Sequence, residues 1–233
     1  NKDRNSAYDA LAEDPLFKCL GSWSPIVRER AAMALARRDE APVPALVKLV
    51  ESPSLESRIG ACQALAQLRE KAAPAVPALK ETLQADDLWL RVKAAEALAA
   101  IGEPAMSAVP QLLERLAQGP TEEDPRAMEQ RYLCFTVFGT MLKKSLDGVD
   151  RGQLRTAVEA GLRNQDGRAR GNIGGIYQQL SYEEIKPLLP AVYEAVVTPS
   201  PSGIMFADGI RLAGLDLLAK HRIKEGMPLC IDI

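Results

Sequence analysis

The sequence predicts an all-α fold, an α-solenoid of about six helix pairs, because one short unit is repeated along the chain. The segment VPAL begins at Val43, recurs at Val76 and returns as VPQL at Val109, so each step is 33 residues. Each copy has a proline at its second position, where a helix start loses no hydrogen bond. These segments are therefore expected to be the first helices of successive pairs.

A second segment lies between these copies and has the spacing of one buried helical face. It reads RERAAMALA from Arg28, RIGACQALA from Arg58 and RVKAAEALA from Arg91. Small or apolar residues fall three, four, seven and eight positions after each arginine, which is typical of an amphipathic helix. Neither helix of a pair can bury its apolar face alone, so the units must stack on one another.

The opening of the second helix distinguishes between repeat families of similar period. The ankyrin turn TPLH and the tetratricopeptide pattern of Trp, Gly and Tyr are absent. Asp87-LWL-Arg91 and Asp166-GRA-Arg170 instead read Asp-x-x-x-Arg, and serines replace the aspartate in the first two units. The chain therefore resembles HEAT and HEAT-like (phycobilisome-lyase-type) repeats, most clearly over residues 15–118. The resemblance implies a right-handed α-α superhelix whose second helices usually line the concave surface.

In chain order, the first helices begin at prolines or capping residues. Asp14-Pro15 starts a helix over 15–20, and Ser24-Pro25 starts its partner, which runs to about residue 38. Gly102 is a stop signal for the sixth helix. The helices that follow the first pair are expected at about 42–50, 55–69, 74–84, 87–101 and 105–118.

The repeat becomes less regular after residue 118. The segment GPTEEDP predicts a surface loop over 119–126, and degenerate repeats over 127–226 follow it. Residues 227–233 resemble the opening of a further, truncated unit. Together these parts are predicted to form a single HEAT-like repeat domain, residues 1–233. Helices in the degenerate part are expected at about 132–144, 150–163, 167–180, 182–197 and 203–222.

Two of these later helices depart from the regular unit. The helix at 132–144 is bulkier than the others, with Phe135 and Phe138 among its apolar residues, so wider helix spacing is expected there. Pro187 and Pro190 should kink or shorten the helix at 182–197, because proline cannot donate the helical hydrogen bond.

Composition and charge narrow the class of protein. Of 233 residues, 47% are apolar and 26% are charged, which is ample for a continuous core in a soluble protein. The net charge of −2 argues against a dedicated nucleic-acid binder. No apolar run approaches the roughly 18 residues of a membrane span, and the polar start does not resemble a signal peptide. The missing initiator Met suggests a fragment or processed form; the compartment stays open, with the cytoplasm as the default expectation.

An arginine recurs at one position of every expected second helix. A cation in the first helical turn opposes the helix dipole, so its recurrence indicates a partner, an acidic or capping group of the adjacent turn. We interpret the set as a structural polar ladder between repeats, with an anion-binding ladder as the alternative. The ladder residues are Arg28, Arg58, Asp87, Arg91, Arg131, Asp166, Arg170 and Arg211.

Positions two, five and nine after each arginine form a stripe on the helical face away from the alanines. Most of its residues are polar and of mixed charge. Because second helices line the concave surface in HEAT-like solenoids, the resemblance makes this stripe the candidate surface for a protein or peptide partner. A merely solvated face is the alternative. The candidates are Arg30, Arg37, Gln63, Gln67, Lys93, Glu96, Thr136, Thr140, Asn172, Gln179, Asp216 and Lys220.

Residues able to carry metal or catalytic chemistry form no recognisable motif. The four cysteines lack CxxC spacing, and Cys62 and Cys134 fall on core positions. His221 is the single histidine, so the several His-Glu pairs of the HEAT-like deoxyhypusine hydroxylases are absent. No Ser/His/Asp set, carboxylate pair or phosphate-binding glycine loop can be argued from the spacing. We therefore expect no catalytic residue, metal or cofactor.

The leading functional hypothesis is a non-catalytic scaffold that binds a protein or peptide through the concave face of the solenoid. A structural spacer within a larger polypeptide is the first alternative. A HEAT-like DNA glycosylase is another, although the slightly negative charge and mixed stripe argue against it. A relative of the chromophore lyases completes the alternatives, but no residue set here carries that activity over. Binding to nucleic acid and insertion into a membrane are not expected.

Overall fold

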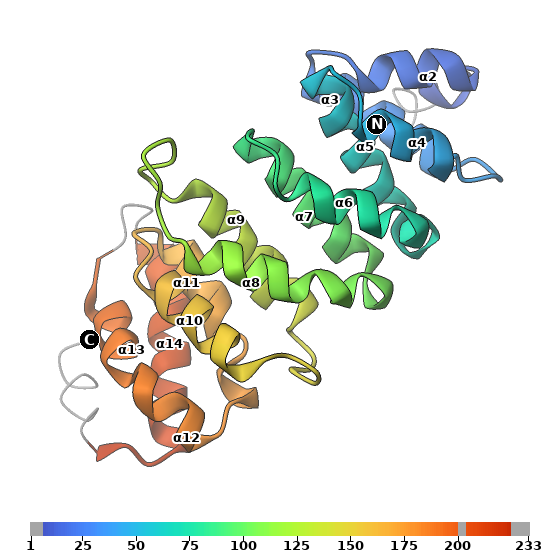
Figure 1. The fold of residues 1–233 in the computed structure, drawn as a ribbon. Helices are drawn as coiled ribbons and strands as arrows, with labels where there is room; N and C mark the ends of the chain where they lie inside the picture. The colour runs from blue at the N-terminus through green and yellow to red at the C-terminus, as the bar shows by residue number, and fades with distance from the viewer. Residues whose placement is uncertain (1–6, 200–203, 225–233) are drawn as a thin grey trace. The chain divides into compact units, whose positions relative to one another are not determined.

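The computed structural model describes residues 7–199 and 204–224, and every regular element within these ranges is helical (Figure 1). This confirms the predicted all-α fold. The chain divides into two compact units: unit 1 ends at Ala108 and unit 2 begins at Val109. The assignment of residues 1–233 to a single repeat domain stays a prediction, and the truncated unit expected at 227–233 lies outside the described residues.

Unit 1 contains three helix pairs whose second helices pack side by side. α3 packs against α5 and α5 against α7, while each first helix packs on its own partner. The short 3-10 helices η1 (Arg69–Ala75) and η2 (Glu103–Ala108) follow α5 and α7. The six helices differ from their predicted ranges by at most two residues at either end. The pairs are α2 (Glu13–Leu20) with α3 (Pro25–Ala36), α4 (Val43–Val50) with α5 (Leu55–Leu68), and α6 (Val76–Thr82) with α7 (Leu88–Ile101).

Capping side chains fix where α5 and α7 begin. The Ser57 backbone N–H donates to the Ser54 hydroxyl at 3.2 Å, and the Leu90 N–H donates to the Asp87 carboxylate at 2.8 Å. Both caps have an extended backbone, the conformation in which Ser and Asp satisfy a free helical N–H. Each of these helices therefore starts one turn before its arginine, which sets the direction in which the arginine points.

Unit 2 continues the pairing with shorter and more interrupted helices. α9 runs into a π-helical turn, η3 (Val137–Met141), and α11 is followed by a 3-10 turn, η4 (Tyr177–Gln179). These turns replace the ends of the longer helices predicted at 132–144 and 167–180; glycine is a poor helix former, and Gly174 and Gly175 end α11 early. The pairs are α8 (Val109–Ala117) with α9 (Met128–Thr136), α10 (Arg151–Leu162) with α11 (Gly167–Gly174), and α13 (Leu189–Val197) with α14 (Ile204–Lys220).

The helix predicted over 182–197 is divided, as its two prolines indicated. It consists of α12 (Tyr182–Ile185), the 3-10 turn η5 (Lys186–Leu188) and α13. Pro187 and Pro190 each lie in the first two positions of a new element, where the missing N–H breaks no helical hydrogen bond.

Two buried carboxylates hold the loop between α8 and α9. The Asp124 carboxylate accepts hydrogen bonds from the backbone N–H groups of Met128 at 2.9 Å and Glu129 at 2.8 Å. Arg115 of α8 donates from Nη2 to both carboxylate oxygens of Glu129, at 3.1 and 3.0 Å. Both acids are 8% exposed. Part of the acidic loop sequence is therefore anchored in the fold and not simply solvated.

The buried face of α9 is shifted by one residue from the predicted register. In α3, α5 and α7, residues three, four, six and seven positions after the arginine are buried. In α9 the same pattern of buried residues lies three, four, six and seven positions after Gln130, one residue before Arg131. Leu133 and Thr136 are therefore 2% exposed, whereas Phe135 is 59% exposed. Phe135 is therefore not a core residue, and Thr136 does not lie on the surface that the stripe was meant to form.

Candidate functional site

Four of the recurring arginines bind backbone carbonyls at or just after the end of the helix that precedes them. Carbonyls in the last turn of a helix, such as those of Val50 and Val196, lack partners within that helix, and a cation there favourably meets the negative end of the helix dipole. The other acceptors lie in the loops that follow α2 and α6. In these four pairs the contact lies within the pair, not between repeats as the sequence analysis expected. The side chains donate from Arg28 to Ser22, from Arg58 to Val50, from Arg91 to Ala85 and Asp86, and from Arg211 to Val196, at 2.6 to 3.2 Å.

Arg170 does join two helix pairs. Its Nη1 donates to the Asn164 carbonyl after α10 at 3.0 Å, and its Nη2 donates to the Thr198 carbonyl after α13, also at 3.0 Å. The side chain is 1% exposed. This arginine is a structural link, as the ladder interpretation predicts.

Gln130 takes the arginine's place in α9. Its Nε2 donates to the Leu116 carbonyl in the last turn of α8 at 2.8 Å. Arg131, the residue chosen from the sequence, instead forms an ion pair with Asp166 at the start of α11, at 3.1 Å, and lies 4.8 Å from the ring centre of Tyr132. This exchange leaves little signal in the sequence, because Gln130 has the donor but not the charge of the recurring residue.

The candidate site is a hollow of about 320 Å³ on the second-helix face of unit 1, hereafter the unit 1 groove. Four of the predicted partner-binding residues line it: Gln63 and Gln67 from α5, and Lys93 and Glu96 from α7. These are the stripe positions of two helices that pack side by side. The stripe therefore predicted four lining residues that the structure brings together.

Four further residues that line the unit 1 groove were not predicted from the sequence. Ala32 of α3 is 1% exposed and Cys62 of α5 is fully buried, and Glu29 and Ala66 complete the lining. These positions fall between those chosen for the stripe. Alanine at the facing positions of neighbouring helices is the available signal, because a short side chain leaves space between longer polar ones.

The polar groups of the unit 1 groove include one ion pair and one hydrogen-bond acceptor that has no partner among the described residues. Lys93 Nζ lies 2.6 Å from Glu96 Oε2, and the two side chains are 29% and 34% exposed. Gln63 Oε1 is shielded from solvent and accepts no hydrogen bond from the described residues. Buried amide oxygens are normally hydrogen-bonded, so Gln63 Oε1 is an unsatisfied acceptor within the described residues.

The one thiol of the unit 1 groove is unreactive. Burial raises the pKa of Cys62 to about 12, an effect that the nearby Arg58 guanidinium only partly opposes. The thiolate is the nucleophilic and metal-binding form of cysteine, so a thiol that stays neutral supplies neither chemistry at ordinary pH.

The other two stripe candidates in unit 1 do not line the groove, and one of them is already bound to another side chain of the chain. Arg30 of α3 is half-buried and does not line the groove. Arg37 donates from Nε to the Asp9 carboxylate at 2.9 Å, which joins the end of α3 to the segment before α2.

In unit 2, most stripe candidates bind backbone carbonyls. Gln179 donates to the Leu142 carbonyl at 2.9 Å, and Lys220 donates to the Gln178 carbonyl at 2.8 Å, so both join neighbouring pairs. Asn172 and Thr140 bind carbonyls of their own segments, Arg168 and Phe135. Asp216 is exposed on α14.

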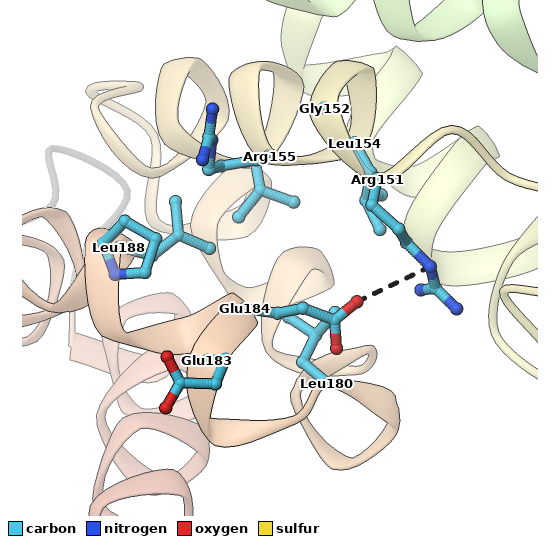
Figure 2. A pocket seen from close by; sticks show the side chains of 10 residues that line it. Arg151, Gly152, Leu154, Arg155, Leu180, Glu183, Glu184 and Leu188 are labelled. Atoms are coloured by element: carbon cyan, nitrogen blue, oxygen red, sulfur yellow. Dashed lines mark ion pairs between the residues drawn. The ribbon is translucent and has the colours of Figure 1, made fainter.

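A second hollow, of about 250 Å³, lies within unit 2 between α10 and the α12–η5 segment; we call it the α10–α12 pocket (Figure 2). Its apolar lining includes Leu154 and Val158 of α10 and Leu188 of η5. Arg151 Nε lies 3.5 Å from Glu184 Oε1 across its mouth. None of its residues was predicted from the sequence as a site residue, although Pro187 was expected to bend this segment.

Within residues 7–199 and 204–224, no group of three or more His, Cys, Asp or Glu side chains is placed to hold a metal ion. None of the helices there has the length and apolar character needed to cross a membrane.

Comparison with known proteins identifies the repeat. Residues 13–81 match the family described as HEAT repeats, which confirms the resemblance for this part of the chain. Over these residues, which are less than half of the chain, the sequence is similar to HEAT repeats, and the helix pairs of the structure form a helical repeat scaffold. No curated protein sequence matches it.

A solved structure supports the same fold over most of the chain. A crystal structure of an engineered protein from the Northeast Structural Genomics Consortium has a TM-score of 0.58 and 17% identity, and covers 89% of this chain and 98% of its own. At this identity the likeness concerns the fold alone. A second engineered protein from the same consortium has 20% identity and a TM-score of 0.46, and covers 89% of this chain and 96% of its own.

Proposed function

We propose that the chain is a non-catalytic interaction module that holds a protein or peptide segment in the unit 1 groove. The observation that carries the proposal is the convergence of Gln63, Gln67, Lys93 and Glu96 on one hollow whose buried amide oxygen has no partner among the described residues. HEAT repeats commonly mediate protein interaction, and the neutral Cys62 thiol gives the groove no reactive group.

The geometry of stacked helices suits an extended segment. Neighbouring helices pack about 8–10 Å apart, and an extended chain advances about 3.3 Å per residue. Every third residue of such a segment therefore meets the next helix as it crosses α3, α5 and α7. Its backbone N–H groups are donors for Gln63 Oε1, and the Lys93–Glu96 pair offers one charge of each sign.

A structural spacer is the second candidate, and specific contacts favour it. Arg37, Gln179 and Lys220 use their polar groups to join parts of the fold, so the stripe is not wholly free for a partner. Nucleic acid is disfavoured as a partner of the unit 1 groove, because Glu29 and Glu96 outnumber Lys93 there and carboxylates repel phosphates.

The experiment is affinity capture from lysate of the source organism with the wild-type chain and a Lys93→Glu/Glu96→Lys variant. The exchange keeps an ion pair at the same spacing and places Glu nearer the helix N-terminus, the orientation that isolated helices prefer. Folding should therefore be retained while the charge pattern of the groove is reversed.

The matched control is a Glu159→Arg/Arg163→Glu exchange, which inverts an exposed ion pair of 2.7 Å at the C-terminal end of α10, outside both hollows. A partner captured by wild type and control but lost by the groove variant supports the proposal. Captures that are identical for all three proteins, or empty, favour the spacer.

A further inference from the structure

The α10–α12 pocket exists because one wall is straight and the other is bent. α10 runs unbroken over Arg151–Leu162, whereas the facing segment turns at Pro187 between α12 and α13. Although α13 packs on α10, α12 lies beyond the bend and leaves a hollow of about 250 Å³. A Leu or Phe side chain fits a space of this size, which is below the range of about 300–1,000 Å³ typical of small-molecule pockets.

The pocket has an apolar centre and a charged rim. Leu154, Val158 and Leu188 are each at most 3% exposed and form part of its lining. Arg151, Arg155 and Glu183 are exposed, and Glu184 is half-buried. Small-molecule sites orient their ligands with polar groups inside the pocket, whereas protein interfaces have an apolar centre and a polar rim. This distribution matches an interface.

The charged residues at the rim of the α10–α12 pocket favour a particular kind of peptide segment. Figure 2 shows Arg151 and Arg155 on α10 and Glu183 and Glu184 on α12, with a dashed line between Arg151 and Glu184, whereas the charged ends of Arg155 and Glu183 point away from each other. Within the described residues, neither Arg155 nor Glu183 forms an ion pair. One unpaired cation and one unpaired anion therefore flank the apolar centre on opposite walls.

The geometry points to a second binding site in this chain, the α10–α12 pocket, for a peptide segment that inserts one large aliphatic or aromatic side chain. That side chain is flanked by an acidic residue, which binds Arg155, and a basic residue, which binds Glu183. The site is separate from the unit 1 groove: it lies on the first helices of two successive pairs, and its occupancy does not depend on the proposed function of that groove.

Methyl NMR titration of the full chain tests this site with three capped peptides. The probes are acetyl-Gly-Asp-Leu-Gly-amide, acetyl-Gly-Leu-Lys-Gly-amide and a control, acetyl-Gly-Asp-Ser-Gly-amide. Both leucine peptides should shift the methyl resonances of Leu154, Val158 and Leu188, and the serine peptide should not, because its side chain leaves the pocket empty.

Variants that reverse one charge then test which residue of the pocket rim binds which peptide. Arg155→Glu should weaken binding of the Asp-Leu peptide about two- to fivefold, the range of an exposed ion pair, and leave the Leu-Lys peptide unchanged. Glu183→Lys should do the reverse. Arg163→Glu, directly after the end of α10 and outside the pocket, is the control and should change neither.

Three results would overturn the proposal. The first is the absence of pocket methyl shifts with either leucine peptide, and the second is equal shifts with the serine peptide. The third is a loss of affinity in Arg163→Glu as large as that in Arg155→Glu. All three exchanged side chains are solvent-accessible, so the wild-type methyl spectrum should be retained and should confirm folding in each variant.

Discussion

Arg170 shows at the residue scale why an arginine recurs in these helices. Its side chain is 1% exposed, and burial lowers the pKa of its guanidinium. A charge in such a place is tolerated only when it is hydrogen-bonded, and the carbonyls of Asn164 and Thr198 provide the acceptors. The residue that opposes its own helix dipole thus stabilises the ends of two other helices.

Replacing Arg170 by Met should lower the free energy of unfolding by about 1–3 kcal/mol, because buried carbonyls lose their donors. Arg58→Met should cost less, since Arg58 is half-buried and binds the Val50 carbonyl through Nε. Urea unfolding followed by circular dichroism compares the two. Equal losses would contradict a special role for the buried link.

Gly60 marks a close approach between α5 and the end of α2. A Cβ atom added there would lie 2.2 Å from the Leu20 carbonyl oxygen, so Gly60→Ala should destabilise the chain by about 1–3 kcal/mol through overpacking. Gly171 is the matched control, because nothing lies within 4 Å of its added Cβ. Gly171→Ala should instead stabilise α11 by up to about 1 kcal/mol. The same unfolding assay decides, and a stabilised Gly60→Ala would refute the close approach.

The buried thiol of Cys62 should make the folded chain less stable at alkaline pH. Burial raises its pKa from 9.0 to about 12, so the unfolded chain releases this proton first as pH rises. Its contribution to stability is complete below pH 9.0 and falls between pH 9.0 and about 12. At about pH 10 the loss is on the order of 1 kcal/mol. Cys62→Ala should therefore lose less stability than wild type between about pH 8 and pH 10, and identical losses would contradict a buried neutral thiol.

At the scale of the element, α9 shows where reasoning from the sequence stops. The units with an arginine, alanines and leucines gave α3, α5 and α7 with their buried faces. In α9, Gln130 holds the arginine's place and Arg131 follows it, so a pattern based on arginine starts one residue late. A one-residue error rotates a helix by about 100°, which is enough to exchange Phe135 with the core.

Two phenylalanines of this segment test the register directly. Phe138→Ala should lower the free energy of unfolding by about 3–5 kcal/mol, because the side chain is fully buried. Phe135→Ala should cost less than about 1 kcal/mol, because that side chain is 59% exposed. Urea midpoints of the two variants provide the measurement. Similarly large losses for both variants would restore the register expected from Arg131, which places Phe135 and Phe138 on the buried face together.

The α10–α12 pocket could not be predicted from the sequence for a different reason. Pro187 indicated a kink, but the direction of the bend depends on how α13 packs against α10. A hollow between two helices depends on how both helices are placed. The residue pattern of either segment alone therefore does not predict it. The unit 1 groove was accessible to sequence reasoning only because α5 and α7 repeat the same spacing.

At the scale of the whole molecule, the repeat determined the architecture and left the partner open. Stacked pairs bury a continuous core with small residues, so a 33-residue period, starting prolines and capping residues were sufficient for the fold class. A binding surface leaves a weaker signal, because polar side chains on a helix face are also what water requires. Gln179 and Lys220 illustrate this, since they have the composition of a binding stripe but join neighbouring pairs.

Site-specific photo-cross-linking tests most directly the claim that the unit 1 groove holds a protein segment. A photoreactive residue is placed at Gln67, exposed in the groove, or at Glu81, exposed on the first helix α6, and the chain is irradiated in lysate of the source organism. Protein adducts at Gln67 that are absent at Glu81, and that disappear in the Lys93→Glu/Glu96→Lys variant, are the predicted result. Adducts at Glu81 alone, or at neither position, would contradict the claim.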